Sequence, residues 1–290
     1  MTALSVSHVP QGVGEAFTGE LTLDVQARAG RSVVVRQGHS GALRVLRPHY
    51  PDTSGQVSVI AINPGGGYLG GDSYRLSASM TAGAALQLTT QSATKVYRTP
   101  QGPVSARQEF VLEDGARLES VPDGLIAYEG ASYRQDTVVR MSSAASLALA
   151  ETVTHGWSPD GTPFAFDEVS LRTEIHVDGR LAVLDNLLLR PGQDGVGPLM
   201  LGGASHLGTL LVVDSRATTA AVEELRAELG ITGRSGTTGA VSALSLLAVP
   251  GFALRSVGGS TQMVEAVLQG ALNWMRRQWH GQQPLDLRKY

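Results

Sequence analysis

The segment 63-NPGGGYLGGD-72 is the part of the sequence that most resembles a ligand-binding motif, because its glycines form a G-x-G-x-x-G pattern directly after the apolar run 57–62. In a dinucleotide-binding protein this loop opens a helix, whose N-terminus offers N–H groups and a positive dipole end to the pyrophosphate. Here residues 73–80 alternate as in a strand, no acidic residue stands about 20 positions past the last glycine, and no Gly-Lys-Ser/Thr comes after it. We therefore predict a loop between strands, in which glycine allows positive φ or a close backbone approach.

Two further catalytic patterns fail on their spacing. The run 203-GASHL-207 begins like the G-x-S-x-G nucleophile elbow, but Leu207 stands at the second glycine and no strand-to-helix context is evident. The seven histidines stand singly, without a pair at i, i+3 or i, i+4, and the chain contains no cysteine. The sequence therefore excludes disulfides and thiolate sites, and it predicts no permanent zinc or nickel site.

Carboxylates in the strand-like part of the chain form a loose set. Each is most simply an outward-facing strand residue, because carboxylates are seldom buried without a partner. The alternative is a polar interior path whose oxygen and imidazole ligands hold a divalent ion weakly. The set consists of Glu109, Glu119, Asp123, Glu129 and Glu151.

The run 89-TTQSATKVYR-98 concentrates hydrogen-bonding side chains between two strand-like flanks. It is interpreted either as a polar strand with a turn, or as the lining of a channel or of a partner surface.

The overall composition excludes several classes of partner. The 290 residues carry 23 basic and 26 acidic side chains, a net charge of −3, so there is no electrostatic basis for binding nucleic acid or an anionic membrane. The longest apolar runs, such as 244–249, are too short to span a bilayer. The first residues have neither the cationic nor the apolar region of a signal peptide, so we expect a cytoplasmic protein.

The elements that must position these residues are mainly β-strands. The 35 glycines are spread along the chain, which indicates many turns between short apolar runs. Four phrases, each a small residue followed by a leucine-led alternating run, recur at about 29 to 34 residues, as stacked supersecondary units do. We predict a mainly β fold with a stacked, β-helix-like body, either a solenoid or a pair of packed sheets. The alternative is that the regular spacing arises by coincidence from successive hairpins. The four leucines are Leu86, Leu118, Leu147 and Leu181.

The C-terminal residues are expected to add a small α+β part. Helices are predicted over 219–230 and 260–281, with a hairpin over 241–257 between them. We divide the chain into a β-rich layered body, 1–200, and a C-terminal segment, 201–290, packed on it as one continuous domain. The apolar face predicted for the second helix consists of Met263, Val264, Val267, Leu268, Ala271, Leu272 and Met275.

The end of the second helix is a candidate partner surface. Trp274 and Trp279 stand five residues apart, which predicts that they do not share one face of the helix. Trp279 with Arg276 and Arg277 resembles the aromatic and arginine enrichment of interface anchors. The alternative is that this helix completes the core.

Four runs together resemble a known family. They are 63-NPGGGYLGGD-72, 88-LTTQSATKVYRT-99, 118-LESVPDGLIAYEGASYR-134 and 250-PGFALRSVGGSTQMVEAVLQGALNWMRRQ-278. In this order and over nearly the whole chain, they are similar to the urease accessory protein UreD family, also called UreH.

The resemblance implies a cytoplasmic, mostly β, non-enzymatic maturation factor. Members of the family bind UreF, which recruits the nickel-carrying GTPase UreG, and the assembly docks on the urease apoprotein. A water-filled tunnel is proposed to carry nickel. The expectation for this chain is therefore no tightly bound cofactor, but transient contact with Ni²⁺. The alternatives are a β-rich hydrolase or lyase with Glu129 or Asp123 as general base, and a purely structural binding protein.

The family motifs also imply site residues. Trp157 and Thr162 depart from the family, which commonly has Arg and Glu there, and this puts a carboxylate contribution at that point in doubt. Glu129 matches the family's acidic residue and is the predicted transient metal ligand. The remaining matches are Gly65, Gly66, Gly70, Gly71 and Asp72 in the loop, and Thr89, Thr90, Gln91, Thr94, Lys95, Val96, Tyr97 and Arg98 in the polar run.

Overall fold

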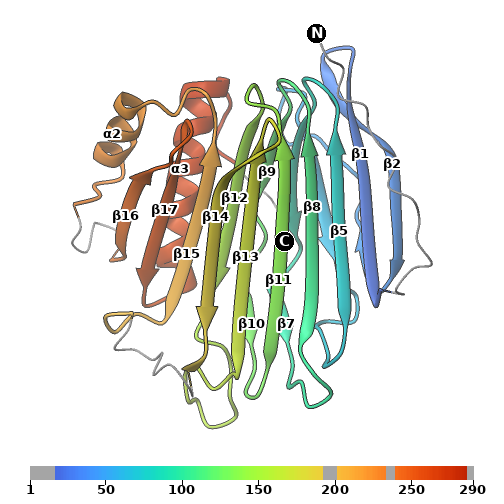
Figure 1. Cartoon of the computed structure of the whole chain (residues 1–290), viewed down its shortest axis with the longest axis vertical. Coiled ribbons are helices and arrows are strands. Elements are labelled where there is room, and N and C mark those ends of the chain that lie inside the picture. Colours follow the sequence, from blue (N-terminus) through green and yellow to red (C-terminus); the bar gives the residue numbers. More distant parts are fainter. Residues whose placement is uncertain (1–16, 192–200, 233–238, 286–290) are drawn as a thin grey trace.

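The strands form two sheets that face each other across an apolar core (Figure 1). The computed structural model describes residues 17–191, 201–232 and 239–285. Within these ranges one sheet has seven strands, in the order β14 (Arg180–Leu189), β13 (Glu168–Val177), β11 (Ser132–Met141), β8 (Val104–Leu112), β5 (Ser73–Met80), β1 (Gly19–Arg28) and β2 (Arg31–Gly41).

The second sheet has ten strands within the same ranges. Eight of them take the order β16 (Val241–Leu246), β17 (Gly251–Gly258), β15 (His206–Val213), β12 (Ser146–Val153), β9 (Arg117–Ser120), β6 (Ala85–Thr90), β4 (Val57–Ile62) and β3 (Arg44–Val45). The short strands β7 (Thr94–Val96) and β10 (Leu125–Ala127) pair with each other, and β10 also pairs with β12.

The body is solenoid-like because successive coils place a strand in each sheet. β4, β6, β9 and β12 are parallel neighbours in the ten-stranded sheet. β1, β5, β8, β11 and β13 are parallel neighbours in the seven-stranded sheet. From β4 to β13 the chain passes back and forth between the two sheets. The predicted mainly β, stacked body is confirmed.

The predicted leucine repeat holds for three of its four members. Leu86, Leu118 and Leu147 are aligned neighbours on β6, β9 and β12, and all three are fully buried. The prediction for Leu181 is wrong, because this residue lies on the antiparallel strand β14 at the edge of the other sheet and is 52% exposed. Its phrase looks like the others because it too comes after a tight turn, here at Gly179 with φ 78°.

The ten-stranded sheet is covered on both faces, because successive residues of a strand point to opposite sides. On β12, Leu147 and Leu149 face the core between the sheets, whereas Ala148 and Ala150 face outward. The outward face is covered by α3 (Thr261–His280), which packs on β12, β15 and β17. The two apolar clusters found among the described residues therefore lie on the two sides of this sheet.

The predicted C-terminal elements are confirmed as the hairpin β16–β17, α2 (Thr219–Glu228) and α3. Both helices begin at a side-chain cap: Thr218 accepts a hydrogen bond from the N–H of Ala221, and Ser260 accepts one from the N–H of Met263. Figure 1 shows both helices at one end of the stack, far from β1 and β2. The strands β15, β17 and β16 continue the sheet of the body, and the predicted boundary at residue 200 lies outside the described residues.

The predicted apolar face of α3 is buried except for Met263, which is 39% exposed. Trp274 and Trp279 are predicted not to share a face of the helix, but this prediction is wrong, because their side chains contact each other. Their rings meet edge to face with centroids 5.5 Å apart, because a long side chain at the end of a helix reaches back towards its N-terminus. Among the described helices, none is long and apolar enough to cross a membrane. The first residues, on which the expectation about export depends, lie outside the described residues.

Candidate functional site

The glycine loop joins β4 to β5 and does not open a helix, as predicted. Its glycines are required by geometry. Gly66 and Gly71 have φ values of 80° and 82°, and a Cβ on Gly67 would lie 2.5 Å from the Tyr97 ring and 3.0 Å from the Lys95 carbonyl oxygen. The chain comes this close because the Tyr68 N–H donates to the Lys95 carbonyl at 2.8 Å. The loop is therefore packed against the polar run, and it borders a cavity.

This cavity has a volume of about 250 Å³ and lies between the two sheets. Asn63, Gly67 and Tyr68 form its wall near the loop. Inward-facing residues of β8, β11, β12 and β13 form the deeper wall. The cavity is thus a gap in the core of the sandwich, and its shape depends on the same alternation that builds the core.

The deep part of the cavity is polar because Gln108, Gln135 and Glu151 occupy inward-facing strand positions. Gln108 Nε2 donates to Gln135 Oε1 at 3.2 Å, and Gln135 Nε2 donates to Glu151 Oε1 at 2.6 Å. The Tyr133 hydroxyl donates to Gln135 Oε1 at 2.9 Å. Gln135 therefore links the two sheets through a chain of hydrogen bonds that satisfies polar groups inside the core.

Glu151 is the carboxylate at the inner end of this chain. Burial raises the pKa of Glu151 to about 7, and the nearby negative charge of Asp185 acts in the same direction. The hydrogen bond from Gln135 and the charge of Arg255 lower its pKa. Asp185 on β14 and Arg255 on β17 form an ion pair between the two sheets. The polar interior therefore extends from Gln108 towards this ion pair, with a group in it that changes charge near neutral pH.

We expect Glu151 to make the fold less stable as the pH rises. The folded state holds this proton more tightly than the unfolded chain does, so the contribution to stability is complete below the ordinary pKa of 4.5 and is lost as the pH passes about 7. Glu151→Gln does not titrate, and between about pH 5 and about pH 8 it should gain about 1–2 kcal/mol in unfolding free energy relative to the unchanged protein. Urea unfolding at several pH values measures this, and parallel pH profiles for the two proteins would contradict it.

Four residues of the predicted polar run line the cavity, at its outer part. The Thr90 hydroxyl accepts a hydrogen bond from the Asp123 N–H at 2.9 Å, and both residues belong to the lining. Thr94 and Lys95 are on β7, whose backbone pairs with β10. The four residues are Thr90, Gln91, Thr94 and Lys95.

Gly66 of the loop also belongs to the lining, whereas the other predicted residues of the loop and the polar run lie outside it. The Thr89 side chain is buried and donates to the Val121 carbonyl at 2.6 Å. Asp72 closes the glycine loop, where its Oδ2 accepts from the Leu69 N–H at 2.8 Å and from the Tyr74 hydroxyl at 3.0 Å. Tyr97 packs edge to face on Tyr128, and Arg98 is exposed beside Gly130.

Glu129 is exposed in the turn after β10, and it lies outside the described residues that line the cavity. Its backbone N–H donates to the Trp157 carbonyl at 2.8 Å, while the residue itself is exposed. Its role as a transient metal ligand stays a prediction, and the structure offers it no place among the interior polar groups of the described residues. Trp157 is 50% exposed and packs on Tyr128 with ring centroids 5.0 Å apart, while Thr162 donates to Asp160 at 2.8 Å.

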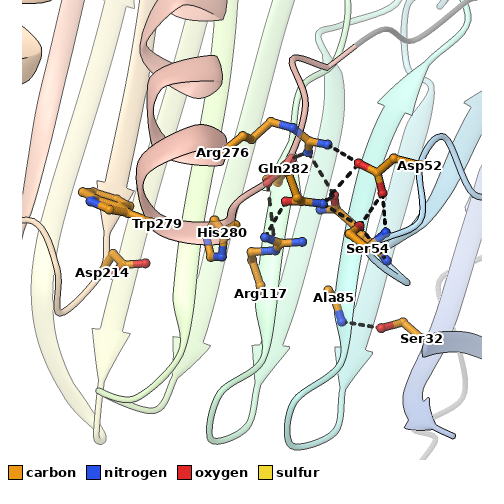
Figure 2. A network of polar contacts seen from close by, with 12 residues as sticks. Ser32, Asp52, Ser54, Ala85, Arg117, Asp214, Arg276, Trp279, His280 and Gln282 are labelled. Carbon is orange, nitrogen blue, oxygen red and sulfur yellow. Dashed lines mark hydrogen bonds and ion pairs between the residues drawn. The ribbon is translucent and has the colours of Figure 1, made fainter. Parts of the chain in front are cut away.

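The predicted partner residues at the end of α3, of which Figure 2 draws Arg276 and Trp279, differ in burial. Trp274 and Arg276 are each 2% exposed, so within this chain they belong to the core, as the alternative interpretation of the helix has it. Arg277 is exposed and bonds Glu228 at 2.5 Å, and Trp279 lies under the Arg216 guanidinium at 5.4 Å. Arg277 and Trp279 stay candidates for a partner surface.

Arg276 is held by a buried polar network. Its Nη1 donates to Glu119 Oε2 at 2.5 Å and to Gln56 Oε1 at 2.9 Å, and its Nη2 donates to Asp52 Oδ2 at 3.2 Å. Figure 2 shows how the end of α3 and the adjoining Gln282 meet the body here. The network fastens the C-terminal segment to β9 and to the loop before β4.

Sequence reasoning missed the pairing of Gln108, Gln135 and Glu151. The alternation along β11 could have shown that Gln135 faces the core, because it shares its side of the strand with the buried Tyr133 and Val139. Sequence spacing also could not show that the rings of His155 and His206 lie 5.4 Å apart. Ser205 bonds His206 Nδ1 at 2.8 Å and precedes a strand, so the predicted absence of a nucleophile elbow at 203–207 is confirmed for this part of the chain. The described residues contain no group of three or more His, Asp or Glu placed to hold a metal.

These features define a two-sheet, solenoid-like β scaffold with a cavity between its sheets that contains inward-facing polar groups, and with a C-terminal helix closing one face. A family model for the UreD urease accessory protein matches residues 17–289. Several proteins named urease accessory protein UreD are similar to the chain. That of Arthrobacter sp. (strain FB24) is 48% identical, covering 95% of each chain. That of Paenarthrobacter aurescens (strain TC1) is 46% identical, covering 95% of this chain and 96% of its own. That of Actinomyces naeslundii is 46% identical, covering 94% and 99%. The chain belongs to the UreD family of urease accessory proteins.

Proposed function

We propose that this chain is a non-enzymatic urease maturation factor and that Ni²⁺ passes through its polar cavity on the way to urease. Membership of the UreD family supports the role in urease maturation. The observation that carries the nickel step is the chain of inward-facing polar groups from Gln108 through Gln135 to Glu151, inside a cavity of about 250 Å³.

The chemistry of the lining suits passage of an ion. Amide and hydroxyl oxygens and the two carboxylates of the lining, Asp123 and Glu151, interact with a divalent cation more weakly than thiolates or grouped imidazoles do, and the chain contains no cysteine. In its charged form Glu151 attracts the ion, and Gln135 and Gln108 offer oxygens further along the cavity. A tight site would retain the ion, whereas this lining lets it continue.

The proposal includes partners. UreF is expected to bind this chain and to bring UreG, the nickel carrier, while the urease apoprotein receives the ion. The exposed side chains of Arg277 at the end of α3 and of Arg98 at the loop end of the stack, together with the partly buried ring of Trp279, are candidates for these contacts. A cytoplasmic location fits this set of partners. Affinity purification of the tagged chain from cells that express the whole urease cluster tests this part; recovery without any other urease-cluster protein would contradict it.

The nickel step is tested by a matched pair of variants. Glu151→Gln and Glu129→Gln both remove one carboxylate charge and keep the shape, but Glu151 lies in the cavity and Glu129 on the surface. In cells with limiting nickel, we expect Glu151→Gln to lower the nickel content and activity of urease together, by about fivefold for a loss of about 1 kcal/mol. Glu129→Gln should stay within about twofold of the unchanged chain.

Nickel supplementation separates transport from folding. A transit defect in Glu151→Gln should be partly rescued by added nickel, because mass action raises occupancy of a weakened path. The recovered amount of the accessory complex serves as the control for folding. Equal urease activation by Glu151→Gln and the unchanged chain at limiting nickel would remove the cavity from the nickel route.

A further inference from the structure

A second pocket, of about 370 Å³, lies on the outer side of the ten-stranded sheet, where the end of α3 meets the corner of the stack. It is separate from the cavity between the sheets, because its lining residues belong to other positions. Arg117 forms its floor on β9, and His280, Asp214 and Arg216 form its walls. Figure 2 shows Arg117, His280 and Asp214 around this corner.

The space exists because the strand positions beside Arg117 hold small residues. Ala85 on β6 and Ser146 on β12 are its aligned neighbours in the sheet. The turns that lead into these three strands place small residues next to the pocket, since each of the repeated phrases begins with glycine or alanine. The arginine therefore stands alone in a row of small residues, and the turns that contribute to the pocket supply Gly83, Gly115 and Ala144.

The Arg117 guanidinium is buried and incompletely paired. The residue is 9% exposed, and its Nη1 donates to Gln282 Oε1 at 2.7 Å. Its Nε has no hydrogen-bond partner among the described residues, and the carboxylate oxygen Glu119 Oε1 is 4.0 Å away. The other oxygen of Glu119 is bound to Arg276 at 2.5 Å. Arg117 thus shares the Glu119 carboxylate with Arg276. A further anion would stabilise the buried positive charge of Arg117.

The other ionisable side chains around the pocket do not take the place of that anion. Arg216 is occupied by Asp214, with Nε to Oδ1 at 2.8 Å and Nη2 to Oδ2 at 2.7 Å. The pKa of His280 is lowered to about 3, first by burial and then by the charges of Arg117 and Arg216, so His280 is neutral at physiological pH. The field at its ring is therefore dominated by the arginines. The Ser146 side chain is hydrogen-bonded to Asp214, and the Ser215 hydroxyl adds a further hydrogen-bonding group to the lining.

We propose that this pocket binds a small inorganic oxyanion of the phosphate and sulfate class, held by Arg117. A tetrahedral oxyanion accepts from a guanidinium and from a hydroxyl group at the same time, which complements a pocket with one incompletely paired guanidinium and the Ser215 hydroxyl. Bound there, the anion would link the start of β9, at Arg117, to the turn after β15 and to the end of α3. The inference does not depend on the role in urease maturation.

Equilibrium dialysis of the full chain with radiolabelled inorganic phosphate tests the proposal at constant ionic strength. We expect about one equivalent bound with Kd below about 1 mM, and competition by sulfate but not by chloride. Arg117→Gln should weaken binding at least about tenfold, because it removes the charge-assisted donors. The matched control, Arg36→Gln, removes a charge whose ion pair with Asp24 is on the exposed edge, and binding should stay within about twofold.

A second measurement uses the unchanged protein and so is independent of how the variants fold. Phosphate should shift the ring NMR signals of His280 and leave the other six histidines in place. Shifts at His280 that saturate with the dialysis isotherm would support the pocket. No bound phosphate at millimolar concentration, binding unchanged in a folded Arg117→Gln protein, or saturating shifts only at other histidines would each overturn the proposal.

Discussion

Replacing Arg276 by Met is expected to lower the free energy of unfolding by about 3–5 kcal/mol, the range seen when one partner of a buried ion pair is removed. The guanidinium is 2% exposed and satisfies Glu119, Gln56 and Asp52 at once. Without it, Glu119 keeps only Arg117, at 4.0 Å, as a counter-charge among the described residues. The expected loss is large because the cost comes from the unpaired carboxylates left behind, and Met fills much of the same volume. Urea unfolding monitored by circular dichroism measures it.

Arg277→Met is the control on the same helix. Its partner Glu228 is exposed, with side-chain exposures of 41% and 47% for the pair, so solvent screens the interaction and the loss should be below about 1 kcal/mol. The double variant Arg276→Met with Glu119→Gln should be less destabilised than the sum of the two single variants, because each removes the partner of the other. If Arg276→Met unfolds within about 1 kcal/mol of Arg277→Met, the network does not fasten α3 to the body.

The second large effect is expected from Gly156→Ala, at about 3–5 kcal/mol. Gly156 has φ 83°, and a Cβ there would lie 2.1 Å from the Ala127 carbonyl oxygen. The same oxygen accepts the Trp157 N–H at 3.1 Å, and the Gly156 N–H donates to Thr154 Oγ1 at 3.2 Å. The overlap is with a backbone oxygen at the end of β10, so its relief requires the two segments to separate and breaks hydrogen bonds around Gly156.

Gly161→Ala provides the comparison, because Gly161 has nearly the same φ, 79°, but nothing within 4 Å of an added Cβ. It should cost only the backbone strain of a left-handed alanine, about 1 kcal/mol. Thermal unfolding of both variants separates overlap from strain. Similar melting temperatures for the two would show that the segment around Ala127 yields easily, contrary to the packing seen.

Local patterns in the sequence determine the strands, the helix ends and the nature of the glycine loop. Alternation of apolar residues specifies the strands, because side chains of a strand point to opposite faces whatever its neighbours are. Ser260 and Gly281 bound α3, since they satisfy and terminate the helix ends through their own geometry. The glycine loop was predicted correctly for the same reason: a strand pattern succeeds it, and this excludes a phosphate-binding helix N-terminus.

The tertiary structure alone decides which polar residues face each other. Glu129 and Glu151 both stand after apolar runs, yet one is exposed in a turn and the other lies in the cavity, hydrogen-bonded to a strand of the opposite sheet. Arg276 looked like a surface anchor by composition, but it reaches carboxylates 157 and 224 residues earlier in the chain. The local sequence pattern determines which face of its own strand or helix a residue occupies. It does not determine which residue lies opposite, because the opposite residue depends on the register and stacking of coils far apart in sequence.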